Sequence, residues 1–170
     1  MRMSVVMSSM ILVLLQFGCA HEPARVAATV AKPDMPPCAG ATCRVPVLVT
    51  VPDAGGCNVL VPYGNVTVAK RNRPRVVWYV VKADPSTDHF HYQFRAGDGI
   101  DIINNDPAYD FDLPDYEPHG NPSQFKWDSV NGRRDPKTFN YEVNVQQSPN
   151  PHGPWTDCTK LDPKITNDGN

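Results

Sequence analysis

Two histidines separated by a single residue are the first candidates for chemistry in this chain. His89 and His91 alternate with Phe90 and Tyr92, which is the pattern of a strand with one apolar face. Side chains two residues apart in a strand share a face, roughly 6.5 to 7 Å apart. Two imidazoles at that spacing hold zinc or a similar metal ion when a third ligand converges on them. The alternative is that both histidines form the solvent face of an edge strand.

A second candidate is an acidic stretch from Asp98 to Glu117, which contains no lysine or arginine. Carboxylate oxygens bind calcium when several of them converge on one point. The spacing does not match an EF-hand loop, because the glycine and the terminal glutamate of that motif are missing. The alternative is a set of solvated acids in turns between short strands, so the sequence leaves both interpretations open.

Residues 98–121 also predict an interaction surface. They contain Pro107, Pro114 and Pro118 together with few core-type positions, which is typical of a long irregular loop. Loops that proline restrains lose less entropy when they bind a partner. A solvated connector is the alternative. If this loop binds a partner, we expect the surface to be lined by Tyr109, Asp110, Asp112, Tyr116 and His119.

The remaining aromatic and basic residues have simpler interpretations. The basic stretch 70–75 (KRNRPR) is typical of an exposed turn, and a patch for acidic glycan or phosphate is the alternative. Trp127 alternates with Phe125 and is predicted to be in the core. Trp155 follows Pro154 in a proline-rich tail and is predicted to cap the edge of the fold.

Motifs of known enzyme classes do not occur in the sequence. It has no G-x-S-x-G, no H-E-x-x-H, no P-loop and no Rossmann glycine pattern. A blue-copper site is rejected because no methionine follows Met35 and no histidine follows the late Cys158. We therefore expect neither catalysis nor a cofactor, and an enzyme of unrecognised type is kept only as a second alternative.

The elements that position these residues are predicted to be short β-strands. The eighteen prolines are incompatible with long helices over most of the chain. Apolar and polar residues alternate instead, and the nearly continuous apolar run at 75–82 is typical of a central strand. Turn residues separate these segments, which predicts an all-β fold: a single antiparallel β-sandwich of about eight short strands, immunoglobulin-like or cupredoxin-like. The predicted strands are 44–51, 57–61, 65–69, 75–82, 89–95, 99–103, 109–113, 125–127 and 139–145.

Four cysteines remain once an N-terminal leader is removed: Cys38, Cys43, Cys57 and Cys158. Four cysteines in an exported domain predict two disulfides, with three possible pairings. We favour Cys38 with Cys43 and Cys57 with Cys158, because the second bond then closes a loop of about a hundred residues and stabilises by roughly 4 to 5 kcal/mol. A thiol metal site is not expected, since the chain has no C-x-x-C pair.

The N-terminal segment has the layout of a secretory signal peptide, predicted here as residues 1–18. Arg2 precedes a mostly apolar run that is too short to span a bilayer permanently. Gly18-Cys19-Ala20 resembles a bacterial lipobox, which implies that Cys19 carries a lipid. Cleavage after Ala20, giving a soluble periplasmic or secreted protein, is the alternative. Residues 19–42 are then a disordered Ala/Pro-rich spacer, and residues 43–170 are the sandwich domain.

The segments 127–131, 141–145 and 161–167, with Cys158 between them, resemble small uncharacterised exported proteins of proteobacteria that have one such sandwich. This resemblance implies a fold and a compartment, and no activity. Loss of Arg2 leaves 15 of the 16 lysines and arginines against 18 acids, a net charge of −3, which does not suit a nucleic-acid partner.

The predicted function is that of a monomeric, non-catalytic lipoprotein module of the cell envelope. It would be anchored in the outer membrane, face the periplasm and bind a protein, peptide or glycan through its loops. A periplasmic sandwich that binds calcium or zinc, through His89 and His91 or through the acidic stretch, is the alternative.

Overall fold

The computed structural model describes residues 34–35, 38, 40–52, 55–69, 73–115, 121–130 and 132–167. All of them belong to one compact unit, residues 31–170. Within these residues the chain has twelve strands and no helix, which confirms the predicted all-β class. The strands are β1 (Thr42–Thr50), β2 (Asn58–Leu60), β3 (Asn65–Val68), β4 (Arg75–Lys82), β5 (His91–Phe94), β6 (Ile100–Ile102), β7 (Phe111–Asp115), β8 (Gln124–Ser129), β9 (Lys137–Val143), β10 (Val145–Ser148), β11 (Thr156–Asp157) and β12 (Lys164–Asn167).

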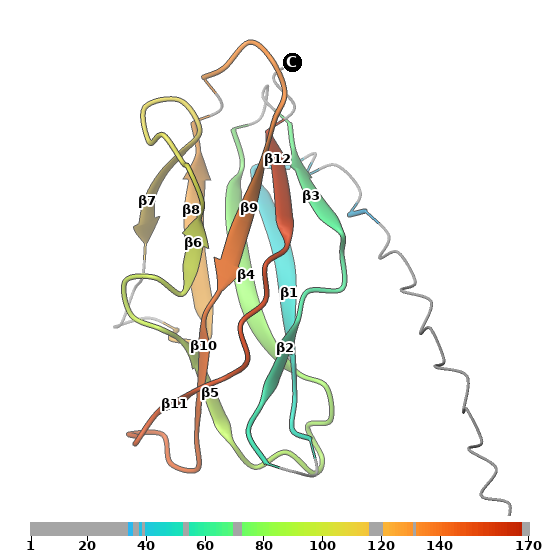
Figure 1. The fold of residues 1–170 in the computed structure, drawn as a ribbon, viewed down its shortest axis with the longest axis vertical. Coiled ribbons are helices and arrows are strands. Elements are labelled where there is room, and N and C mark those ends of the chain that lie inside the picture. The colour runs from blue at the N-terminus through green and yellow to red at the C-terminus, as the bar shows by residue number, and fades with distance from the viewer. Residues whose placement is uncertain are drawn as a thin grey trace, which may run out of the picture. The chain divides into compact units, whose positions relative to one another are not determined.

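The strands form two layers. One layer is a five-stranded sheet in the order β2-β1-β4-β8-β7. A four-stranded sheet, β3-β12-β9-β6, lies against it, and a three-stranded sheet, β11-β10-β5, continues that second layer where β9 runs on into β10 (Figure 1). This arrangement is a β-sandwich, as the alternating pattern predicts.

The expectation of a purely antiparallel sandwich is wrong at two places. β1 and β4 are parallel neighbours along eight residue pairs, from Thr42 and Arg75 to Val49 and Lys82. β12 and β3 are also parallel. Parallel neighbours need a crossover connection. For β1 and β4 that connection contains β2 in the same sheet and β3 in the opposite layer, so the chain leaves the first sheet and returns to it.

Aromatic side chains from both layers fill the space between the sheets. Trp78 of β4 is fully buried, as its place in the apolar run predicts, and packs edge to face on Tyr141 of β9 with ring centroids 5.5 Å apart. Phe111 and Phe139 make a similar contact at 5.8 Å. Trp127 is also buried, which confirms it as a core residue. Edge-to-face pairs of this kind add about 0.5 to 1.5 kcal/mol to the hydrophobic burial.

The two disulfides pair Cys38 with Cys43 and Cys57 with Cys158, which confirms the favoured arrangement. They lie at opposite ends of the sandwich. Cys43 is at the start of β1, whereas Cys57 precedes β2, whose first residue pairs with the last residue of β1. We call these the Cys43 end and the Cys57 end. Two disulfides indicate an oxidising, exported environment.

Candidate ligand-binding site

The histidine pair does not lie on one strand. β5 begins at His91, so His89 belongs to the preceding loop, and both side chains are exposed. Among the described residues, no group of three or more histidines, cysteines, aspartates or glutamates comes together in a way that could hold a metal ion. The third ligand that a metal site at His89 and His91 needs is therefore not supplied by this part of the chain.

The predicted interaction surface is divided between the interior and the exterior of the Cys43 end. Residues 98–115 are not an irregular loop, because β6 and β7 lie within them. Tyr109 is 52% exposed, and the Arg133 guanidinium carbon lies 5.6 Å from the centre of its ring. Asp112 is exposed on β7. Tyr116 and His119 lie outside the described residues.

Asp110 is a correction to that prediction, because it is completely buried and cannot line a surface. Arg133 donates to both of its carboxylate oxygens, at 2.6 and 3.0 Å, and the Lys137 ammonium donates at 3.3 Å. The backbone N–H of Asp106 donates to it at 3.2 Å. A buried carboxylate needs such partners to remain charged, so this acid holds together the loops of the Cys43 end.

The electrostatics of Asp110 follow from these contacts. Burial alone raises the pKa of its carboxyl, because it removes the charge from water. The hydrogen bonds from Arg133, from the Asp106 backbone and from Lys137 act in the opposite direction, and together they hold the pKa below its ordinary value. Asp110 is therefore a charged structural group.

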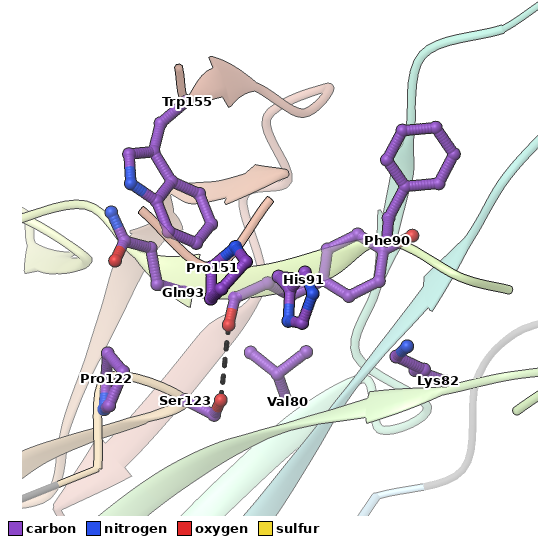
Figure 2. A pocket seen from close by; sticks show the side chains of 10 residues that line it. Val80, Lys82, Phe90, His91, Gln93, Pro122, Ser123, Pro151 and Trp155 are labelled. Carbon is purple, nitrogen blue, oxygen red and sulfur yellow. Dashed lines mark hydrogen bonds between the residues drawn. The ribbon is translucent and has the colours of Figure 1, made fainter. Parts of the chain in front are cut away.

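A different set of residues forms a concave site at the Cys57 end. It is a cleft of about 290 Å³, close to the lower limit of roughly 300 Å³ for small-molecule pockets. We call it the Trp155 cleft. Figure 2 shows the Trp155 indole and Gln93 on one side, Phe90 on the other, and His91 and Val80 between them. Its walls also include Lys82, Tyr92, Pro122, Ser123 and Pro151.

The floor of the Trp155 cleft is set by β4, β5 and a short segment that bridges them. The backbone N–H of Val80 donates to the Ser123 carbonyl at 2.9 Å. The Ser123 hydroxyl donates to the Tyr92 carbonyl at 3.2 Å, the bond drawn in Figure 2. Alternation along β5 buries Tyr92 and Phe94 and turns His91 and Gln93 outward. The strand therefore presents polar groups to the cleft from a rigid base.

The loop between β10 and β11 fixes the position of Trp155. The Gly153 N–H donates to the Asn150 carbonyl at 3.2 Å, which closes a turn. Gly153 has φ of +89°, a conformation that favours glycine. A Cβ added there would lie 3.0 Å from Cδ1 and 3.2 Å from Nε1 of the Trp155 ring. The indole thus packs directly on the glycine backbone, and it is half-buried rather than free to rotate in solvent.

The polar groups around the cleft differ in how fully they are used within the protein. The Tyr92 hydroxyl donates to Asp88 at 2.8 Å. Burial is the main reason why the pKa of Tyr92 is raised, and the neighbouring Asp88 carboxylate raises it further. The Lys82 ammonium donates to the Asp88 carbonyl at 2.9 Å and keeps two further protons to donate. The Gln93 amide donates to Gln146 at 3.3 Å, and His91 is exposed. Lys82, His91 and Gln93 can therefore still bond to a ligand.

Of the residues that line this cleft, only His91 is among the candidate functional residues of the sequence, where it is considered as a metal ligand. Trp155 was predicted to cap the edge of the fold, and in the structure it lines the cleft. A signal was available in the sequence: Trp155 follows Gly153-Pro154 and lies outside any alternating strand pattern, so the core does not account for it. The partners that complete the cleft come from positions 80 to 155, and no local pattern brings them together.

Comparison with known proteins does not assign this site. No family model matches the chain, and no curated protein matches it. In the part of the chain that the structure describes, no helix is long and apolar enough to cross a membrane.

Proposed function

We propose that this protein is a non-catalytic binding module of the cell envelope and that it binds a glycan in the Trp155 cleft. The observation that carries the proposal is the Trp155 indole, which is held against the Gly153 backbone at the mouth of a concave site. A ring that is already fixed loses little entropy when a ligand stacks on it.

The chemistry of the walls favours a sugar. One face of a pyranose ring is apolar and stacks on aromatic side chains, here Trp155 and Phe90. Its hydroxyl groups both donate and accept hydrogen bonds, and so match the mixed set of Lys82, His91 and Gln93. An N-acetylated amino sugar adds an amide that can pair with Gln93 and a methyl group for the apolar walls. We therefore take N-acetylated amino sugars as the ligand class.

The compartment is the second part of the proposal. Two disulfides suit an exported protein, and the resemblance of Gly18-Cys19-Ala20 to a lipobox supports a lipid on Cys19. Ala20 in place of aspartate supports delivery to the outer membrane, with the monomeric domain facing the periplasm. Both Cys19 and Ala20 lie outside the described residues. A Cys19→Ser variant with unchanged processed mass and unchanged membrane association would remove this part of the proposal.

A fluorescence titration tests the cleft. The chain has three tryptophans, and Trp78 and Trp127 are buried. A change in tryptophan fluorescence on ligand binding therefore reports mainly on Trp155. With the β-1,4-linked N-acetylglucosamine tetramer as probe, we expect a saturable change in the wild type. Calorimetry should show affinity at least tenfold lower in Trp155→Ala, about 1.4 kcal/mol. Tyr109→Ala removes an exposed aromatic ring at the opposite end and should bind as the wild type does.

A pair of glycine variants tests whether the fixed position of Trp155 matters. Gly153→Ala and Gly97→Ala both place a side chain at positive φ, +89° and +85°. Only at Gly153 does the new Cβ meet the Trp155 ring, since nothing lies within 4 Å of the position at Gly97. We expect weaker tetramer binding in Gly153→Ala alone. The proposal is wrong if the wild type does not bind the tetramer, or if Trp155→Ala binds it equally well.

A further inference from the structure

A second cavity adjoins the Trp155 cleft. It has a volume of about 620 Å³ and is lined on its apolar side by Val49, Val51, Pro52, Ala83 and Phe90. Phe90 lines the Trp155 cleft as well, so the two cavities share one wall. We call this second space the Val51 cavity. A single sugar ring stacked on Trp155 leaves it unfilled.

The boundary between the two cavities is a fixed part of the fold. Lys82 lines the cleft, Asp88 lines the Val51 cavity, and the Lys82 ammonium donates to the Asp88 carbonyl at 2.9 Å. The Phe90 backbone N–H donates to the Asp88 carboxylate at 2.9 Å. Phe90 packs against the core and is half-buried, so its ring forms a ridge that a bound chain would cross.

The polar lining of the Val51 cavity restricts what can occupy it. Its described lining includes Asp84 and Asp88 and no lysine or arginine. Asp84 accepts hydrogen bonds from Ser86 and Thr87, which lower its pKa and keep it charged. Two carboxylates repel an acidic group, but their remaining lone pairs accept hydrogen bonds from neutral hydroxyl or amide N–H groups.

We infer that the Trp155 cleft and the Val51 cavity are adjacent subsites for one linear, neutral chain of N-acetylated amino sugars. One unit stacks on Trp155. The chain crosses Phe90, and the next unit places an acetamido methyl against Val51 and Pro52, with its N–H and hydroxyl groups near Asp84 and Asp88. The inference rests on the proposed function. It adds that the ligand must contain more than one sugar unit and that the unit in the Val51 cavity must be uncharged.

The test is calorimetry of the full chain with N-acetylglucosamine oligomers of one, two, three, four and six units. We expect affinity to rise at least tenfold from one unit to two and then to level off, because two units fill the two subsites. A tetramer in which some of the acetamido groups carry a carboxylate should bind more weakly than the neutral tetramer. Equal affinity for all lengths, with Trp155→Ala still weakening every one, overturns the inference and leaves the proposed function intact.

A matched pair of variants locates the second subsite. Val51 and Leu60 are equally exposed apolar residues, at 39% and 38%, and only Val51 lines the cavity. Val51→Glu should bind the hexamer no more tightly than the monomer, whereas Leu60→Glu should keep the full gain with length. A gain that survives in Val51→Glu overturns the two-subsite arrangement. Binding of a proline-rich peptide with no binding of any oligomer overturns both this inference and the proposed function.

Discussion

The two ends of the sandwich use polar residues in opposite ways. At the Cys43 end the loops around β7 and β9 close over Asp110, whose carboxylate is saturated by Arg133, Lys137 and the Asp106 backbone. At the Cys57 end the loop between β10 and β11 holds Trp155 beside a cleft, where Lys82 and other groups keep hydrogen-bonding capacity. The two loop groups lie at the top and the bottom of Figure 1.

This difference separates stability from binding. A buried charge that is fully paired contributes to a unique fold and leaves little capacity for a ligand. An aromatic ring fixed next to polar groups with unused donors is available for a ligand. The loop predicted over residues 98–121 placed Asp110 on a binding surface, yet its carboxylate is buried and serves the interior. Charge density alone therefore does not locate a site in this chain.

Removal of the disulfides should show the largest contrast between the ends. The Cys57–Cys158 bond spans a sequence separation of 101, and the Cys38–Cys43 bond a separation of 5. On chain entropy, replacing the first pair with serine should cost about 5 kcal/mol and replacing the second about 2 kcal/mol. Guanidinium unfolding of the two double variants measures both values. Equal losses would show that loop closure does not control how the two ends are stabilised.

Asp110→Asn should cost about 3 kcal/mol of unfolding free energy, because it leaves Arg133 and Lys137 without their buried counter-charge. Asp112→Asn, two residues away and exposed, is the matched control and should change stability by less than about 0.5 kcal/mol. Urea unfolding separates the two variants. Tetramer binding should be unchanged in both variants. A loss of binding in Asp110→Asn would contradict the separation of stability at the Cys43 end from binding at the Cys57 end.

The pH dependence of this difference has a definite sign. The pKa of Asp110 is lower in the folded than in the unfolded chain, so its stabilisation is complete above the unfolded pKa of about 3.9. That stabilisation is lost as the pH falls through the folded value. The stability gap between the wild type and Asp110→Asn should therefore shrink below about pH 4, and a gap that widens on acidification would contradict the assignment.

The strands were the predictable part of this molecule. The nearly continuous apolar run predicts β4 at its observed bounds, and the alternation of Tyr92 and Phe94 predicts the buried face of β5, which occupies His91–Phe94 within the predicted 89–95. The parallel pairing of β1 with β4 was not predictable, because it depends on which layer the intervening β2 and β3 join. Local pattern specifies a strand and its buried face, but not its neighbours.

The candidate sites were harder to predict for the same reason. Asp110 lies 23 and 27 residues from its partners Arg133 and Lys137, so nothing near it in the sequence distinguishes it from a solvated acid. Trp155 lies 62 residues from Gln93, beside it in the cleft, and 65 residues from Phe90 on the other side. Only the fold brings these groups together, whereas the disulfide pairing could be anticipated because few alternatives existed.

The smallest effect is expected from an exposed ion pair at the Cys43 end. Arg75 donates to both carboxylate oxygens of Asp128, at 2.7 and 3.0 Å, but the two side chains are 47% and 55% exposed. Solvent screens such pairs, so Arg75→Gln should cost less than about 1 kcal/mol, against about 3 kcal/mol for the buried Asp110. The hydrogen bonds from Arg75 lower the pKa of Asp128, and an NMR titration should show it rising toward its ordinary value in the variant. If Arg75→Gln lowered the unfolding free energy as much as Asp110→Asn does, burial would not be what separates the strong ion pair from the weak one at the Cys43 end.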